Sequence, residues 1–329
     1  MINDSVTEGG NALNREIAVS IICITYNHEE YIRDALNSFV MQKTDFQFEI
    51  LIHDDASTDN TAAIIREYEI RYPEIIKPIY QKENQYSKGL ALGEPFAFID
   101  KYQYSRVKGK YIALCEGDDY WTDQYKLQKQ FDAMEEHSEV DMCAHAAYVV
   151  RNGKKIDRIA PKKEKTIIPV NEVILGGGGF VATNSLFFRT NMRNNIPEFM
   201  KCVHLDYSLQ IWGALRGGLL YLPDYMSCYR AEVQGSWTLR MLNDRSAEIE
   251  HLKRINNMLE VLNKETNGKY AEDISTHISE NRITILERER KFNDIKSEEF
   301  ITYYRNLPLK RRLAINIKRV LKTLGFFNK

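Results

Sequence analysis

The chain has 329 residues and carries 45 lysine and arginine residues against 46 aspartate and glutamate residues, so its formal net charge is −1. This balance excludes the strongly basic surface of a dedicated nucleic-acid-binding protein, and we expect no nucleic-acid partner. Hydrophobic residues make up 43% and charged residues 28% of the chain, which is ordinary for a globular protein and unlike a disordered one. The length predicts one large domain with an appendage, or two domains.

Residues 1–16 form a polar leader without the apolar segment of a signal peptide. No apolar run in the chain approaches the roughly 20 residues that cross a bilayer. The five cysteines lie far apart, are odd in number and form no CxxC pair. This pattern argues against a disulfide framework and against a cysteine zinc site. We therefore expect a cytoplasmic protein.

Short apolar runs alternate with segments of helical periodicity from residue 17 onward. The first run, IAVSIICI, is β-branched and is typical of a strand buried on both faces. We expect strands at 17–24, 48–52, 75–80 and 111–115, and helices at 29–41, 61–72, 97–107 and 123–137. This alternation predicts an α/β domain with a mostly parallel sheet.

The segments between and after these elements are less regular. Residues 82–95 are rich in Gly, Asn, Lys and Ser and predict a long loop. Extended chain is expected at 140–150 and 185–189, whereas 151–170 is charged and is expected to be irregular.

Polar side chains follow the ends of three expected strands. Ligands of open α/β sheets bind beyond the carboxyl ends of the strands, so these side chains are candidates for a site. They are Thr25, Tyr26 and Asn27 after the first strand, Asp54 and Asp55 after the second, and Glu116, Asp118 and Asp119 after the fourth. Several carboxylates in one cleft repel each other unless a cation offsets them. Magnesium or manganese ions accept carboxylates together with phosphate oxygens, so the pattern favours a nucleoside diphosphate ligand.

Each of these groups also has a purely structural interpretation. Asp54 and Asp55 fit a turn that caps the following helix. The acidic segment at 116–119 fits a solvated turn, and Tyr26 fits a packing residue. The chain has no GxGxxG after the first strand and no GxxxxGK[ST], GxSxG or HExxH motif. Their absence weakens a dinucleotide-binding, P-loop, α/β-hydrolase or zincin interpretation.

Three segments resemble the family-2 inverting glycosyltransferases with a GT-A fold: VSIICITYNHEEYIRDALNSFVMQ, EILIHDDASTDNT and GKYIALCEGDDYWTDQYKLQKQ. The form EGDDYWTD…KLQKQ is similar to the bacterial branch that assembles capsule, O-antigen and other surface polysaccharides. The close resemblance covers about residues 17–150, and a weaker one extends to about residue 237. It implies transfer of a hexose or N-acetylhexosamine from a UDP-sugar to a hydroxyl group, with a divalent metal (manganese or magnesium) as cofactor.

The resemblance also implies roles for the residues at the strand ends. The nucleotide pocket would be lined by Thr25, Tyr26, Asn27, Asp54 and Asp55. Asp55 would accept the uracil N–H, and Asp118 would bind the metal that bridges the diphosphate. Glu116, which replaces the first aspartate of the family's DxD element, would face the ribose or a metal-bound water. Asp119 would support the site or contact the donor sugar.

Three later segments resemble the family's acceptor side and closing loop. TNSLFFR at 183–189 is similar to the strand that precedes the acceptor site. HLDY at 204–207 is similar to the family's ED segment, with Leu205 in place of the usual Glu, and implies Asp206 as the catalytic base. Its structural interpretation is a cap on a helix expected at 206–215. The segment 229–237 is similar to a loop that closes over the diphosphate, which implies donor contacts from Arg230 and Trp237.

These features together predict a metal-dependent inverting glycosyltransferase with a glycan or lipid-linked acceptor. Two other classes stay open. A sugar nucleotidyltransferase would usually need a glycine-rich basic loop near the N-terminus, which residues 25–33 do not supply. A non-catalytic sugar-nucleotide-binding protein would keep the fold and lose the acids, whereas Asp55, Asp118 and Asp206 are present.

Beyond about residue 237 the chain is rich in Leu, Ile, Glu, Lys and Arg, so we expect a helical C-terminal region at 238–329 after a GT-A domain at 17–237. Residues 300–329 contain eight basic residues and no acidic residue. One helical face there holds Leu313, Ile317, Val320, Leu321 and Leu324, with Arg311, Lys318, Arg319 and Lys322 opposite and Ile315 on the polar side. This pattern predicts peripheral contact with the inner membrane surface; the alternative is a helix packed on the domain.

Overall fold

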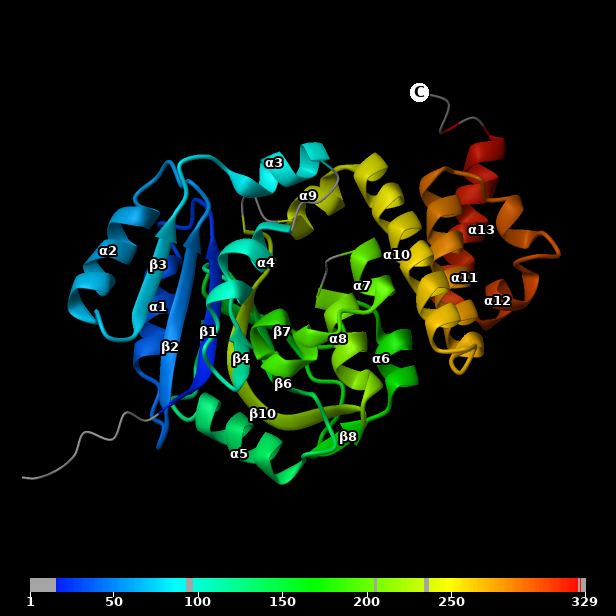
Figure 1. Ribbon diagram of the computed structural model, residues 1–329. Coiled ribbons are helices and arrows are strands. Elements are labelled where there is room, and N and C mark those ends of the chain that lie inside the picture. Colours follow the sequence, from blue (N-terminus) through cyan, green and yellow to red (C-terminus); the bar gives the residue numbers. More distant parts are fainter. Residues whose placement is uncertain (1–15, 93–96, 204–205, 234–236, 325, 327–329) are drawn as a thin grey trace, which may run out of the picture.

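The computed structural model describes residues 16–92, 97–203, 206–233, 237–324 and 326. Its centre is one mixed sheet (Figure 1). The strand order is β3-β2-β1-β4-β9-β6-β10-β5, with β7 beside β6 and β8 beside β10. The strands are β1 (Ile17–Thr25), β2 (Gln47–Asp54), β3 (Ile76–Tyr80), β4 (Tyr111–Leu114), β5 (Tyr120–Trp121), β6 (Met142–Arg151), β7 (Lys154–Ile159), β8 (Thr166–Ile168), β9 (Phe187–Arg189) and β10 (Leu219–Arg230).

The N-terminal half of the sheet is parallel: β1 pairs with β2 and β4, and β2 pairs with β3. β1 lies inside this half and is buried on both faces. Val19, Ile21 and Cys23 pack into one hydrophobic cluster, whereas Ile22 packs into another. Because successive side chains of a strand point to opposite faces, a strand covered on both sides needs the continuous apolar run that the sequence shows.

Helices cover both faces of the sheet. α1 (Ile32–Val40), α2 (Thr61–Arg71) and α5 (Lys126–Glu136) contribute to the cluster that contains Ile21. α6 (Val170–Gly176), α8 (Asp206–Leu215), α10 (Arg245–Glu265) and α11 (Ala271–Arg288) contribute to the cluster that contains Ile22. The remaining helices of this part are α3 (Gln85–Leu92), α4 (Ala97–Tyr102), α7 (Glu198–Cys202) and α9 (Trp237–Asn243).

The last two helices, α12 (Ile301–Asn306) and α13 (Leu309–Thr323), pack with the end of α11. Their contact is a third, smaller cluster that includes Ile283, Tyr304 and Ile315. Among the residues that the structure describes, no helix is long and apolar enough to cross a membrane.

The expected α/β architecture is confirmed, and the first four expected strands correspond to β1–β4. Residues 82–95, expected as a loop, instead contain α3. Its first turn is held by side chains: Asn84 Oδ1 accepts from Ser87 N at 2.7 Å, and the Asp55 carboxylate accepts from Gln85 N and Tyr86 N. Because Asp55 lies 30 positions away from Gln85, the sequence around residues 82–95 does not indicate this contact or the helix that it stabilises.

Residues 151–170, expected to be irregular, contain β7 and β8. β7 pairs with β6 alone, at the side of the sheet, where charged residues are common because they discourage further pairing. The sequence pattern does not predict β10.

Pro223 and Asp224 interrupt the apolar pattern of β10, and they lie at an irregularity where the pairing with β6 shifts between Leu222 and Tyr225. Proline lacks an N–H donor and is tolerated in a sheet at such a position.

Candidate active site

The carboxyl ends of β1 and β2 are joined by hydrogen bonds between the segments that follow them. Asp55 N donates to Thr25 O at 3.0 Å. Asn27 N donates to Ser57 Oγ at 2.9 Å, and Asn27 Oδ1 accepts from Thr58 N at 2.7 Å. Asn27 has a φ of 55°, a left-handed conformation that asparagine adopts more readily than most residues. The first two polar segments are therefore brought together as the sequence predicts.

The acidic loop after β4 approaches β1 too closely for a side chain at position 117. A Cβ atom there would lie 2.5 Å from Thr25 Oγ1 and 3.1 Å from His28 Nδ1. Both of these atoms are buried and have no hydrogen-bond partner among the described residues. Unpartnered buried polar atoms are rare in proteins, and here they line the strand ends where a ligand is expected.

Asp54 and Asp55 are both buried at the end of β2 but differ in their partners. Asp55 accepts from Gln85 N at 2.7 Å and from Tyr86 N at 3.0 Å, and His53 Nε2 lies 3.4 Å from its Oδ1. Burial acts to raise the pKa of Asp55, but the hydrogen bonds outweigh burial and lower it. Burial raises the pKa of Asp54, whose Oδ1 has no partner in the described part of the chain. Asp55 therefore caps α3, and Asp54 keeps an unused oxygen.

The carboxyl groups of the acidic loop influence one another. Glu116 keeps accessible surface, yet desolvation by the surrounding protein and the charges of Asp118 and Asp206 raise its pKa to about 8. Burial and the charges of Asp118 and Glu116 raise the pKa of Asp119 well above its usual range. His28 Nε2 lies 4.0 Å from Asp118 Oδ2. Negative charge is thus unfavourable in this loop, and a bound cation would relieve it.

Asp119 is 1% exposed, and both of its oxygens are used inside the protein. Asn184 Nδ2 donates to Oδ2 at 2.9 Å, and Arg230 N donates to Oδ1 at 2.8 Å. The Arg230 guanidinium donates to Asp118 O at 2.6 Å and forms an ion pair with Asp34. Asp119 and Arg230 therefore fix the acidic loop against the end of β10.

Asp206 is the first residue of α8, and two hydrogen bonds fix its carboxylate. Thr183 Oγ1 donates to Oδ2 at 2.8 Å, and Tyr207 N donates to Oδ1 at 2.8 Å. Burial raises the pKa of Asp206 against the lowering effect of these bonds. The contact with Tyr207 N agrees with the interpretation of Asp206 as a helix-start residue. A raised pKa also makes a carboxylate a stronger proton acceptor, so the geometry is compatible with both interpretations.

Some predicted residues cannot be placed, and some residues at the site were not predicted. Leu205 and residues 234–236 lie outside the described residues, as does the side chain of Trp237. His28, Thr183 and Asn184 were missed as site residues. His28 directly follows the Thr-Tyr-Asn segment and could have been included for that reason. Thr183 and Asn184 belong to the segment 183–189 that resembles the strand before the acceptor site, but the sequence does not show their carboxylate partners, which are 23 and 65 positions away.

In the part of the chain that the structure describes, no three His, Cys, Asp or Glu side chains lie close enough to hold a metal ion by themselves. Magnesium and manganese, however, are commonly bound by one or two carboxylates together with phosphate oxygens. Asp118, with the raised pKa of Glu116 beside it and the unpartnered Thr25 Oγ1 nearby, fits such a shared site. The donor set suits a metal that a diphosphate helps to hold.

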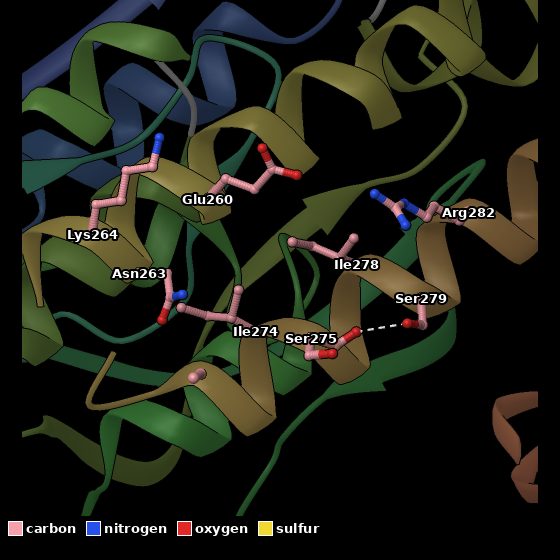
Figure 2. Close-up of a pocket in the computed structure, with 9 residues that line it drawn as sticks. Glu260, Asn263, Lys264, Ile274, Ser275, Ile278, Ser279 and Arg282 are labelled. Atoms are coloured by element: carbon pink, nitrogen blue, oxygen red, sulfur yellow. Dashed lines mark hydrogen bonds between the residues drawn. The ribbon is translucent and has the colours of Figure 1, made fainter. Parts of the chain in front are cut away.

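A hollow of about 360 Å³ lies between α10 and α11. Figure 2 shows Glu260 and Lys264 on α10 and Ser275, Ile278 and Arg282 on α11 around it. It is lined by none of the strand-end residues, and its charged groups are of both signs. The candidate active site therefore lies at the strand ends and not in this hollow.

Comparison with known proteins identifies the family. The family model of Glycosyl transferase family 2 matches residues 20–194, more than half of the chain, and the chain belongs to this family. An uncharacterized protein of Mycobacterium tuberculosis is 38% identical over 221 residues, which cover 67% of this chain and 60% of that protein. TuaG of Bacillus subtilis, named as a teichuronic acid biosynthesis glycosyltransferase, is 32% identical over 140 residues, which cover 43% of this chain and 51% of TuaG.

The chain spans about 60% of the length of the first of these relatives. Among solved structures, S. aureus TarS (residues 1–349) in complex with UDP-GlcNAc matches with a TM-score of 0.57 at 18% identity, covering 91% of this chain and 84% of the TarS chain. This likeness confirms the expected GT-A fold.

Proposed function

We propose that the chain is a metal-dependent inverting glycosyltransferase that moves a hexose or N-acetylhexosamine from a UDP-sugar to a hydroxyl group of a glycan or lipid-linked acceptor. The observation that carries the proposal is that the acidic loop lies against the end of β1: Gly117 N donates to Ile24 O at 2.9 Å, next to the unpartnered Thr25 Oγ1. Family membership and the UDP-GlcNAc complex of TarS support the donor class. The name of TuaG supports a role in cell-surface polysaccharide synthesis.

The proposed nucleotide pocket uses the ends of β1 and β2. Tyr26 is 43% exposed, and its ring is available to stack on uracil, beside Thr25 and Asn27. Asp55 accepts the uracil N–H in this proposal, since a carboxylate has about four acceptor positions and its bonds to α3 leave room for another. Asp54, with its unpartnered Oδ1, assists.

The proposed diphosphate site uses the acidic loop. Asp118 holds the metal, which when bound neutralises the charge that grows on the departing UDP. Glu116 faces the ribose. We assign Asp119 to positioning, because its oxygens already accept from Asn184 and Arg230. Arg230 steadies the loop through Asp118 O, and the proposed donor contact of Trp237 stays a prediction.

Asp206 is the proposed base. Its two hydrogen bonds hold the carboxylate in one orientation, and its raised pKa favours proton uptake. The acceptor hydroxyl loses its proton to Asp206 as the oxygen forms a bond to C1 of the sugar. The bond from C1 to the diphosphate oxygen breaks on the opposite face, so the anomeric centre inverts and UDP leaves.

Two broader expectations belong to the same proposal. The boundary at residue 237 between a catalytic domain and a helical region stays a prediction, and α10 and α11 share the core that contains Ile22. A peripheral place at the cytoplasmic face of the membrane is proposed as the site of action.

The test is UDP release from a panel of UDP-, GDP- and dTDP-sugars, with and without manganese, for the wild type and Asp118→Asn. The rate of metal-dependent transfer by the variant should fall at least about 100-fold, as expected for a lost metal ligand. It should also lose manganese-dependent UDP binding in calorimetry. Asp157→Asn, the same change at an exposed position of β7, is the matched control and should change neither. Transfer by Asp118→Asn within about threefold of wild type contradicts the metal assignment. With added pyrophosphate, release of UTP and sugar 1-phosphate instead of UDP would identify a nucleotidyltransferase.

A further inference from the structure

α13 packs on the protein through the side that its sequence pattern makes polar. Ile315 is fully buried in the cluster that contains Tyr304. Arg311 Nε donates to Glu287 Oε1 at 3.0 Å, and Lys322 Nζ donates to Arg290 O at 2.7 Å. Ile315, which the pattern sets apart from the apolar face, is thus the anchor of the helix. The apolar face of α13 points away from the protein.

That apolar face of α13 is open to solvent. Six side chains, which we call the apolar stripe, are 51% to 73% exposed: Leu309, Leu313, Ile317, Val320, Leu324 and Phe326. The first five recur every three or four residues and therefore share one side of the helix over roughly 22 Å. They and Phe326 are six of the twelve large apolar side chains exposed in the described part of the chain. Such clustering differs from the scattered exposure usual on protein surfaces and marks an interaction site.

The surroundings of the apolar stripe are basic. Lys310 is exposed beside the stripe. Lys318 and Lys322, farther round the helix, are also exposed, although they contact Glu287 and Arg290 O. The chain has no acidic residue from 300 onward. At the C-terminal end of α13, a hollow of about 250 Å³ is lined by Lys291, Arg319 and Lys322, together with Asp294. The partner of this surface is therefore expected to be apolar with an anionic boundary.

We propose that α13 docks the protein on an anionic phospholipid surface, with the apolar stripe at the boundary between headgroups and acyl chains and the flanking cations on the headgroups. A second copy of the chain fits less well, because two such faces would oppose lysine with lysine. α13 lies at the opposite end of the molecule from α2 (Figure 1). The inference deepens the proposed function, since a lipid-linked acceptor lies at such a surface, but its physical argument does not depend on catalysis.

The test is co-sedimentation of the full chain with phosphatidylcholine vesicles that contain about 30% phosphatidylglycerol, at low and at high salt. The double variant Leu313→Ser with Ile317→Ser removes the centre of the apolar stripe, where both side chains are already exposed. Lys310→Glu reverses the charge of an exposed lysine beside the stripe. Ile70→Ser, at an 80% exposed position of α2, is the matched control. Point substitutions are preferred to truncation, because removing α13 would uncover the cluster that Ile315 completes.

The wild type and Ile70→Ser should bind these vesicles, and both α13 variants should bind at least about tenfold more weakly. Binding of the wild type should fall in high salt and on vesicles of phosphatidylcholine alone. Equal sedimentation of the wild type and both variants overturns the proposal. So does a wild-type dimer in light scattering that the serine variant converts to a monomer, because a second copy would then cover the stripe. Asp206→Asn should bind vesicles normally, so failure of the catalytic proposal and failure of docking are distinguished.

Discussion

Asn184 is predicted to hold the acidic loop in place although it need not touch the substrate. Its Nδ2 donates to Asp119 Oδ2 at 2.9 Å and to Cys228 O at 3.0 Å, and its Oδ1 accepts from Ser227 Oγ at 2.6 Å. Asn184→Ala removes all three bonds in a buried position. A bond to a charged group contributes about 1.5–3 kcal/mol and a neutral one about 1 kcal/mol. We therefore expect the free energy of unfolding to fall by about 3–5 kcal/mol.

Urea unfolding with linear extrapolation measures this loss. Asn194→Ala, at an exposed asparagine, is the control and should stay within about 0.5 kcal/mol of wild type. Asn184→Asp keeps the shape but sets a second carboxylate against Asp119. The pKa of one of the two carboxyl groups then rises in the folded state. The variant should therefore be least stable relative to wild type at neutral pH, and its stability should recover as the pH falls. A loss below about 1 kcal/mol for Asn184→Ala would refute the positioning role.

Two further predictions concern stability. Gly117→Ala brings a Cβ within 2.5 Å of Thr25 Oγ1 and should cost about 1–3 kcal/mol, whereas Gly179→Ala, where a Cβ meets nothing within 4 Å, should be nearly neutral in the same urea assay. Lys126 is fully buried over the Trp121 ring, and burial lowers its pKa to about 7. Between about pH 7 and pH 10 the unfolded chain holds one more proton than the folded chain, so wild-type stability rises with pH by up to about 1.4 kcal/mol per unit. Lys126→Met should remove this rise and be more stable than wild type at pH 7; an unchanged pH dependence would contradict the assignment.

The parallel half of the sheet could be predicted because continuous apolar runs in its sequence indicate strands that are buried on both faces. The apolar run of β1 packs on both faces, and the polar segments after β1, β2 and β4 converge as the topology requires. β10 escaped prediction because Pro223 breaks its pattern at a pairing irregularity. α3 escaped because its first turn is held by Asp55, far away in the chain.

In the candidate site, too, some residues could be predicted from the sequence and others depend on contacts between distant parts of the chain. Asp118 and Asp206 could be proposed because family motifs mark them, whereas Thr183 and Asn184 act through partners that only the fold brings near. On α13 the pattern correctly separated an apolar side from a basic one. It could not tell which side packs on the protein, because that depends on how Ile315 fits the third cluster.

The central claim is that Asp206 is the base of a glycosyl transfer. Asp206→Asn tests it directly, because asparagine is as good a helix-start residue as aspartate. Its Oδ1 can still accept from Tyr207 N, and its Nδ2 can donate to Thr183 Oγ1. Transfer and UDP-sugar affinity should be measured on the same preparation, in the presence of manganese. The account predicts nearly unchanged donor affinity and transfer reduced by at least about 100-fold. Transfer near the wild-type rate, or a collapse of donor affinity, would contradict it.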